Sequence, residues 1–130
     1  MPLMKLHVHK DAWTTEGKNR LLDVVHEVMV RCFRVPANDR YQILSEHPEG
    51  NLRALDTGLG FQRTLHFVLL EIVSRPRSKA DKMLFYEELA NALLQSCDLA
   101  TTDLMISFVS NSDDDWSFGM GEAQFVTGSL

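Results

Sequence analysis

Hydrophobic and polar residues alternate strictly near the start of the chain. Residues 3–9, LMKLHVH, place every second side chain on the same side, which is typical of a half-buried strand. A helical pattern follows to about Arg34, with Thr14 as its candidate N-cap. Its apolar positions recur at the spacing of one helix face: Leu21, Val25, Val28 and Cys32. Pro36 ends this helix, and residues 41–47, YQILSEH, predict a second strand.

The second half of the chain repeats this order of elements. Residues 66–74, HFVLLEIVS, form a nearly continuous apolar run, which indicates a strand covered on both faces. Ser78 and Asp81 form a capping-box pattern at the start of a helix that extends to about Cys97. Residues 104–110, LMISFVS, predict the last strand.

The two halves also share a spacing. In each, 25 positions separate the candidate N-cap from an Asp that precedes the following strand. We therefore expect residues 1–130 to form a single domain with a pseudo-repeat of residues 2–47 and 64–110 and a C-terminal arm, 111–130. Each β-α-β unit then has a parallel strand pair joined by a right-handed crossover helix. The expected fold is α/β (α+β): a four-stranded mixed sheet with two helices on one face and another subunit covering the other.

Composition and charge narrow the function classes. The net charge is −5 and no long basic run occurs, which argues against a nucleic-acid or anionic-membrane partner. No signal-peptide pattern occurs, and no apolar stretch approaches about 18 residues, so we expect a soluble, cytoplasmic protein. Cys32 and Cys97 fall late in predicted helices and are interpreted as reduced core residues, although an even cysteine count also permits a disulfide.

Two arginines flank a proline in SRPRS, residues 74–78. Pro76 biases Arg75 toward extended backbone, in which positions i and i+2 share a side, so Arg75 and Arg77 should project together. Such a pair suits a carboxylate or phosphate, and it precedes a helix N-terminus, which also favours anions. The alternative is a solvated basic turn that balances nearby acids.

Pro2 directly precedes the first predicted strand. Proline is tolerated as the first residue of a strand, which is the structural interpretation. Alternatively, removal of Met1 gives Pro2 a free secondary amine at the mouth of a folded domain. If Met1 stays attached, Pro2 is an amide without a basic nitrogen and its chemistry is disabled.

Asp39, in PANDRYQ, lies where the first helix turns into the second strand. It is either a turn residue or salt-bridge partner of Arg40, or a group that orients water or tunes a neighbouring amine. The tail offers apolar residues that either close the core or wall a small pocket: Trp116, Phe118, Phe125 and Leu130. The run DDD at 113–115 lacks the spacing of an EF-hand loop and is interpreted as a solvated turn.

Pro2, the duplicated β-α-β pattern and the Arg-Pro-Arg after the third strand together resemble the tautomerase superfamily, whose members use an amino-terminal proline as the catalytic group. More narrowly, PANDRYQ, DTGLGF, SRPRS and NSDDDWSFGMGEAQFVTG resemble the malonate semialdehyde decarboxylase branch. The resemblance runs over essentially the whole chain. PANDRYQ, SRPRS and DWSFG in that order, with a proline at position 2, are specific only in combination.

The resemblance implies roles for the residues that match. Pro2 matches the catalytic proline and Asp39 the acid that assists it, while Arg75 and Arg77 match the substrate-binding arginines. The tail residues fall where family members have a hydrophobic wall: Trp116, Phe118, Phe125 and Leu130. The resemblance also implies a homotrimer that takes a small carboxylate substrate and needs neither metal nor organic cofactor.

The implied reaction is decarboxylation of malonate semialdehyde to acetaldehyde and carbon dioxide. A protonated Pro2 would polarise the substrate carbonyl, whereas a neutral Pro2 would form an iminium, and the balance between the arginines and Asp39 decides between them. The same site also suits a tautomerase or hydratase acting on 2-oxo or unsaturated acids. A non-catalytic small-acid-binding protein is expected if Met1 is retained, and a structural oligomerisation module is the remaining alternative.

Overall fold

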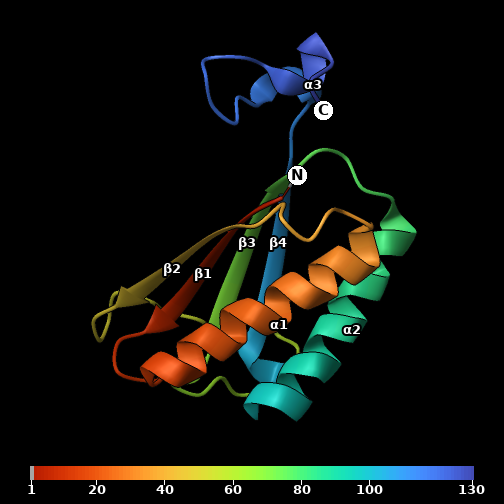
Figure 1. The fold of residues 1–130 in the computed structure, drawn as a ribbon. Coiled ribbons are helices and arrows are strands. Elements are labelled where there is room, and N and C mark those ends of the chain that lie inside the picture. Colours follow the sequence, from red (N-terminus) through yellow and green to blue (C-terminus); the bar gives the residue numbers. More distant parts are fainter. Residues whose placement is uncertain (1) are drawn as a thin grey trace.

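The computed structural model describes residues 2–130 and has two layers (Figure 1). Four strands form one sheet, and two long helices lie across one of its faces. The strands are β1 Leu3–His9, β2 Tyr41–His47, β3 Val68–Ser74 and β4 Leu104–Ser110. The helices are α1 Thr15–Phe33, α2 Lys79–Cys97 and the short α3 Gln124–Thr127, with 3-10 turns η1 Thr101–Asp103 and η2 Asp113–Asp115.

The strand order is β2-β1-β3-β4. β1 pairs in parallel with β2, and β3 in parallel with β4, whereas the central pair of β1 and β3 is antiparallel. The predicted mixed sheet with one parallel pair in each half is therefore confirmed. Because β1 and β3 are antiparallel, the starts of β1 and β2 lie at the same end of the sheet as the ends of β3 and β4. We call this the site end of the sheet.

Side-chain caps fix where the two long helices begin. The Thr14 hydroxyl accepts a hydrogen bond from the Gly17 amide at 3.0 Å, as predicted for an N-cap. The Ser78 hydroxyl likewise accepts from the Asp81 amide at 3.0 Å. The Asp81 carboxylate also binds the guanidinium of Arg34 at 2.8 Å, which ties the end of α1 to the start of α2.

The hydrophobic core lies between the helices and the inner face of the sheet. Alternate β1 residues point into it, as do the four α1 residues that the sequence pattern selected. Both cysteines are free, so the disulfide alternative is wrong. Cys32 is buried, and burial together with a hydrogen bond to Glu88 raises its pKa to about 11, which keeps the thiol protonated and unreactive. Cys97 is only partly buried.

The outer face of the sheet carries apolar side chains that the helices do not cover. The strand register aligns one row across all four strands: Tyr41, Leu3, Val73 and Val109. Tyr41 and Val109 are 43% and 60% exposed in the single chain. β3 is not apolar throughout, because Glu71 points outward between the half-buried Leu69 and Val73. This face is the one on which the sequence predicts a neighbouring subunit.

Residues 111–130 form an arm beyond the end of β4 (Figure 1). The predicted arm contains η2, a single bridge between Gly119 and Glu122, and α3. Within the described chain, neither of the long helices has the length and apolar character needed to cross a membrane.

Candidate functional site

The first strand begins at the site end, directly after the buried Pro2. Leu3 pairs with Tyr41 on one side and with Val73 on the other. Continuing both registers by one residue places Pro2 between Arg40 and Ser74, and hence between Asp39 and the arginine pair that follows β3. Met1 lies outside the described residues, so the free amine of Pro2 stays a prediction.

A turn anchored to α1 holds Asp39. The Asp39 amide donates to the Pro36 carbonyl at 3.0 Å, and His26 Nε2–H donates to the Ala37 carbonyl at 2.8 Å. His26 is 8% exposed and comes from α1, so the helix fixes the backbone on which Asp39 sits. This role of His26 is not predictable from the sequence, because it depends on how α1 packs against the turn.

The Asp39 carboxyl is 5% exposed. Burial raises the pKa of Asp39 above its ordinary value, and the nearby Arg77 guanidinium opposes that rise. The interpretation of Asp39 as a salt-bridge partner of Arg40 is wrong, because Arg40 turns away to bind Asp23 at 2.7 Å. Asp39 is thus a buried carboxyl close to a cation and to the start of β1. Such a group can orient water or shift the pKa of an amine at Pro2.

Arg77 is held by the body of the domain. Its Nε donates to the Ser74 hydroxyl at 3.1 Å and its Nη1 to the Phe33 carbonyl at 3.3 Å. The guanidinium also lies 5.3 Å from the centre of the Phe33 ring. Burial and the neighbouring Arg75 cation lower the pKa of Arg77, yet such a group stays charged at neutral pH. A half-buried guanidinium with a fixed orientation is suited to binding a carboxylate.

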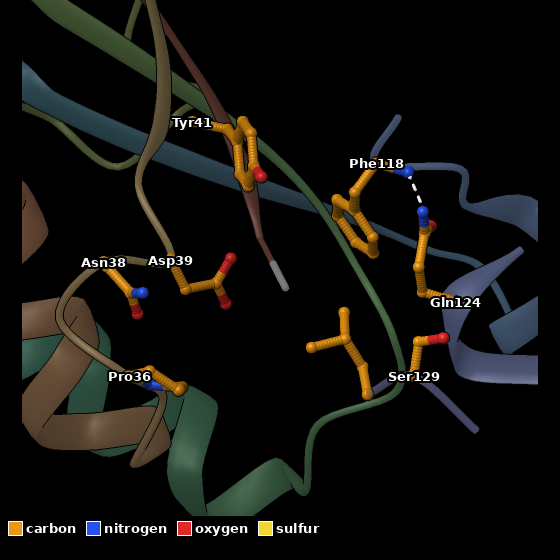
Figure 2. A pocket seen from close by; sticks show the side chains of 8 residues that line it. Pro36, Asn38, Asp39, Tyr41, Phe118, Gln124 and Ser129 are labelled. Carbon is orange, nitrogen blue, oxygen red and sulfur yellow. Dashed lines mark hydrogen bonds between the residues drawn. The ribbon is translucent and has the colours of Figure 1, made fainter. Parts of the chain in front are cut away.

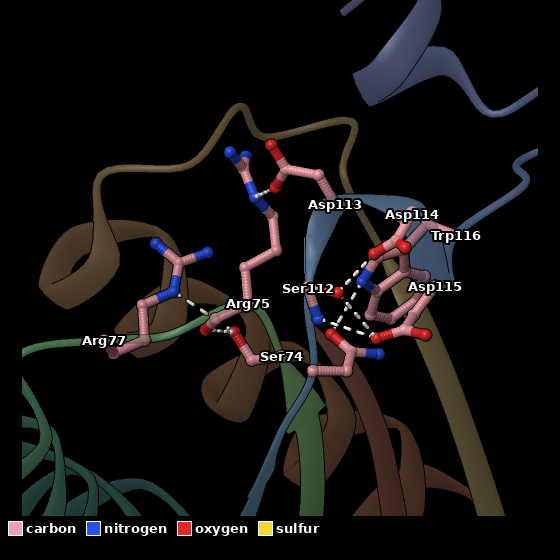
Figure 3. Close-up of polar contacts among 9 residues, drawn as sticks. Ser74, Arg75, Arg77, Ser112, Asp113, Asp114, Asp115 and Trp116 are labelled. Carbon is pink, nitrogen blue, oxygen red and sulfur yellow. Dashed lines mark hydrogen bonds and ion pairs between the residues drawn. The ribbon is translucent and has the colours of Figure 1, made fainter.

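Arg75 is held by the C-terminal arm (Figure 3). Its Nε forms an ion pair with Asp113 Oδ1 at 2.7 Å, and its guanidinium lies 4.1 Å from the centre of the Phe125 ring. A hollow of about 320 Å³ is lined by Arg75, Pro76, Arg77 and Asp113. Both arginines line this hollow, as expected of a pair that projects together. The alternative of a solvated basic turn that balances nearby acids holds in part for Arg75, which pairs with Asp113, but not for Arg77, which is held by Ser74 and Phe33.

A second hollow of about 320 Å³ lies between the turn before β2 and the arm. Figure 2 shows Asp39 facing Phe118, Gln124 and Ser129 across it. Its lining residues are Pro36, Asn38, Asp39, Tyr41, Phe118, Gln124, Ser129 and Leu130. Asp39 lines this hollow and Arg77 lines the first, and the Arg77 guanidinium lies near enough to Asp39 to lower the pKa of its carboxyl. The candidate site therefore combines an acidic group, basic groups and an apolar wall.

Aromatic rings of the arm form the apolar wall. Trp116 stacks on Phe118 with ring centroids 5.4 Å apart and an interplanar angle of 9°. Phe125 meets Phe118 edge-on at 5.4 Å, and Tyr41 contributes a tilted contact at 5.7 Å. Trp116, Phe118 and Phe125 are only partly buried and lie outside the core cluster, so the alternative that they close the core is wrong. Leu130 is exposed and lines the second hollow.

Several lining residues were missed at the sequence level. Tyr41 faces outward at the start of β2, and the alternation of side chains along that strand is the only sequence signal that predicts which face of the sheet it occupies. Gln124 accepts from the Phe118 amide at 2.9 Å and donates to the Gly119 carbonyl at 2.7 Å, so it shapes the arm around the hollow. The interpretation of residues 113–115 as a solvated turn is confirmed, because they form an exposed 3-10 turn, but it does not reveal the ion pair between Asp113 and Arg75.

No three His, Cys, Asp or Glu side chains gather in a metal-binding arrangement within residues 2–130. His7 and His9, which share a face of β1, are not part of such an arrangement. His7 instead bonds to His47 at 2.8 Å and to Glu71 at 2.6 Å across the outer face of the sheet.

Two family models described as tautomerase enzyme match the chain, one over residues 39–119 and the other over residues 2–62. Among curated proteins, the probable tautomerase YrdN of Bacillus subtilis (strain 168) is 48% identical over 130 residues, covering 100% of both chains. The probable tautomerase YusQ of the same organism is 25% identical and covers 97% of this chain and 99% of its own.

Solved structures agree with these matches. A malonate semialdehyde decarboxylase, whose structure was described as the basis of its decarboxylase and hydratase activities, is 45% identical to this chain. The two structures have a TM-score of 0.95, and the match covers 98% of both chains. A fused 4-OT that forms a symmetric trimer is 17% identical with a TM-score of 0.77, covers 97% of this chain and 98% of its own, and shows the fold alone. The protein described here belongs to the tautomerase enzyme family.

Proposed function

We propose that this protein is a cofactor-independent decarboxylase of a small 3-oxo acid, which converts malonate semialdehyde to acetaldehyde and carbon dioxide. The observation that carries the proposal is the meeting of Pro2, Asp39 and the two arginines at one end of the sheet. The likeness to malonate semialdehyde decarboxylase, at 45% identity, supports the choice of substrate.

Each group has a role in the proposed reaction. Arg75 and Arg77 hold the substrate carboxylate and orient the bond that breaks. Pro2, once it carries a free amine, either polarises the aldehyde carbonyl as a cation or condenses with it to an iminium. The carboxylate leaves as carbon dioxide, and the bonding electrons form the C=C bond of an enol or enamine, which takes up one proton at carbon. The enol route gives acetaldehyde directly. In the iminium route, the water released on condensation is added back, which hydrolyses the iminium to acetaldehyde and free Pro2. Asp39 sets the charge state of Pro2.

The apolar wall favours this chemistry. Rings of Trp116, Phe118 and Phe125 exclude water from one side of the site, which strengthens the electrostatic interactions within it. Carbon dioxide is neutral and leaves an apolar wall more readily than the anion from which it forms. We also propose that the protein works as a homotrimer in the cytoplasm, with the exposed apolar row of the sheet inside the assembly.

A tautomerase or hydratase is the second candidate function. The names of the Bacillus relatives, probable tautomerases at 48% and 25% identity, favour it. The hydratase activity ascribed to the decarboxylase structure favours it as well. Both reactions would use Pro2 and the arginine pair on a 2-oxo or unsaturated acid.

The test combines mass and turnover on one sample purified from the native host. Intact mass spectrometry reports whether Met1 is removed, and native mass spectrometry reports the number of subunits. The same sample is assayed with malonate semialdehyde, with the enol form of a 2-oxo acid and with an unsaturated acid. We expect a processed trimer. Its rate acceleration over the uncatalysed reaction should be larger for decarboxylation of malonate semialdehyde than for the reactions of the other two acids.

A processed chain that is active only on the other two acids would replace the decarboxylase with the second candidate function. A chain that keeps Met1 would leave no amine at Pro2, and the site would then be a non-catalytic acid-binding site. A Pro2→Ala variant is the matched control, because its N-terminus can also be processed but lacks the secondary amine. Full activity in this variant would contradict a role for the proline ring.

A further inference from the structure

We propose that Asp113 sets the charge preference of the anion site, so that the site accepts small monocarboxylates and excludes dicarboxylates. The inference rests on the proposed function, because it assigns a specificity to the same arginine pair. Asp113 comes from η2 of the arm and is paired with Arg75 at 2.7 Å.

The formal charges around the hollow explain the preference. Two guanidiniums and one carboxylate line it, so the lining carries a net charge of +1 from Arg75, Arg77 and Asp113. The Asp39 carboxyl near Arg77, where ionised, makes the surroundings less positive still. A monocarboxylate neutralises this charge. A dicarboxylate brings its second charge next to Asp113, and like charges at short range repel. Malonate semialdehyde is a monoanion, whereas an oxidised product of the same length is a dianion.

The geometry lets Asp113 act without blocking the site (Figure 3). Asp113 accepts from Nε of Arg75, which is one edge of the guanidinium. The opposite edge, formed by the two terminal nitrogens, can still hold a carboxylate in bidentate fashion. Asp113 therefore removes one unit of positive charge while it keeps Arg75 in place. It is a specificity-determining residue that acts by its own charge, not a catalytic residue.

The neighbouring acids of the DDD run have different partners. Asp114 binds the Ser112 hydroxyl, and Asp115 accepts from the Ser112 amide at 2.8 Å. Both contacts shape the 3-10 turn on which Asp113 is presented. Among the described ion pairs, Arg75 has only Asp113 as its acidic partner. Asp114 consequently offers a control with the same change of charge at the adjacent position.

The experiment measures binding of two matched probes, malonate and monomethyl malonate, by isothermal titration calorimetry. The pH is kept above both pKa values of malonate, so that the probes differ in charge but share a skeleton. We expect the wild type to prefer monomethyl malonate. In Asp113→Asn, the Kd of malonate divided by the Kd of monomethyl malonate should fall by about fivefold, which is the scale of one partly exposed charge interaction. Asp114→Asn should leave the ratio unchanged.

Three outcomes would overturn the inference. Equal weakening of both probes in Asp113→Asn would mean that Asp113 only positions Arg75. The same shift in Asp114→Asn would mean that net charge alone is responsible. A wild type that binds neither probe, or does not discriminate between them, would also reject the preference.

Failure of the inference and failure of the proposed function give different results. An enzyme that decarboxylates malonate semialdehyde but shows no charge-dependent shift keeps its function and loses the role of Asp113. A protein with the expected shift in binding but no turnover keeps the charge preference and loses the decarboxylase.

Discussion

Arg75 and Arg77 are two residues apart in one short segment, yet different parts of the molecule hold them. Arg77 is bound by Ser74 and the end of α1, both parts of the packed domain. Arg75 is bound by Asp113 and Phe125, both from the arm. The domain thus presets one cation of the site, and the arm sets the other.

The two supports differ in how firmly they are built. The turn that carries Asp39 is fixed to α1 through the buried His26, next to the hydrophobic core. The arm is joined to the domain at its base, where the Asn111 amide donates to the Ser74 carbonyl at 2.8 Å and Asp113 pairs with Arg75. Farther along the arm, the Phe118 ring contacts Tyr41. Segments with few buried contacts open at lower free energy than the core. Binding and release of ligand should therefore depend on the arm, and the proton and charge chemistry on the domain.

The largest effect is expected when each arginine is replaced by methionine, which tests the contrast between the cation held by the domain and the cation held by the arm. Arg77→Met should lower kcat/KM for malonate semialdehyde by about three orders of magnitude, because the preset carboxylate contact is lost. Arg75→Met should lower kcat/KM by only about tenfold, because the arm leaves that contact adjustable. Arg77→Met also loses the hydrogen bonds to Ser74 and Phe33 and the cation next to the buried Asp39, so it should lower Tm, while Arg75→Met leaves Tm unchanged. Steady-state kinetics and calorimetry check both; equal kinetic losses would remove the contrast.

Asp39→Asn should have the next largest effect. We expect kcat to fall by about two orders of magnitude, the usual scale for a group that governs proton transfer. Because burial raises the folded-state pKa of Asp39 above 3.8, the folded state binds more protons than the unfolded chain in the window between the two pKa values. Asp39 therefore costs stability as pH rises through that window, and the Asn variant does not bear this cost.

Calorimetry over a pH series measures that difference. The Tm advantage of Asp39→Asn over the wild type should grow as pH rises from 3.8 and level off above the folded-state pKa. An advantage that shrinks with rising pH would mean that a cation stabilises the ionised carboxylate more than burial disfavours it.

The smallest effect is expected from Phe118→Ala in the arm. The variant loses the ring that stacks on Trp116 and faces Asp39 across the hollow, so KM should rise by about tenfold with kcat much less affected. Tm should stay within measurement error, because the ring lies outside the core. A clear fall in Tm would show that the arm contributes to the stability of the whole domain.

Local signals made much of the fold predictable. Thr14 and Ser78 mark helix starts because an N-cap acts within three residues, and the alternation of β1 gives its faces directly. The convergence of the arginine pair was also local, because Pro76 restricts the backbone between them. The duplication of residues 2–47 as 64–110 within one domain stays a prediction.

Long-range contacts were not predictable in the same way. The pairing of Asp113 with Arg75 depends on the direction in which the arm leaves β4, and the link of His26 to the turn depends on the packing of α1. The outward side of Tyr41 followed from strand period, but its role in the hollow required the arm to be placed. The roles proposed for Pro2 and Asp39 come from resemblance to a family, and no spacing in this sequence specifies them.

The antiparallel join of β1 and β3 has a practical consequence for anyone who modifies this chain. It brings the start of the first strand and the arm that ends at Leu130 to one edge of the sheet (Figure 1). A tag fused before Pro2 would acylate the nitrogen on which the proposed chemistry depends, and a tag after Leu130 would extend from a residue that lines a hollow. The connection from 48 to 67 follows the end of β2 at the opposite edge. Labels and affinity handles therefore belong in the exposed turn at residues 58–60 of that loop rather than at either terminus.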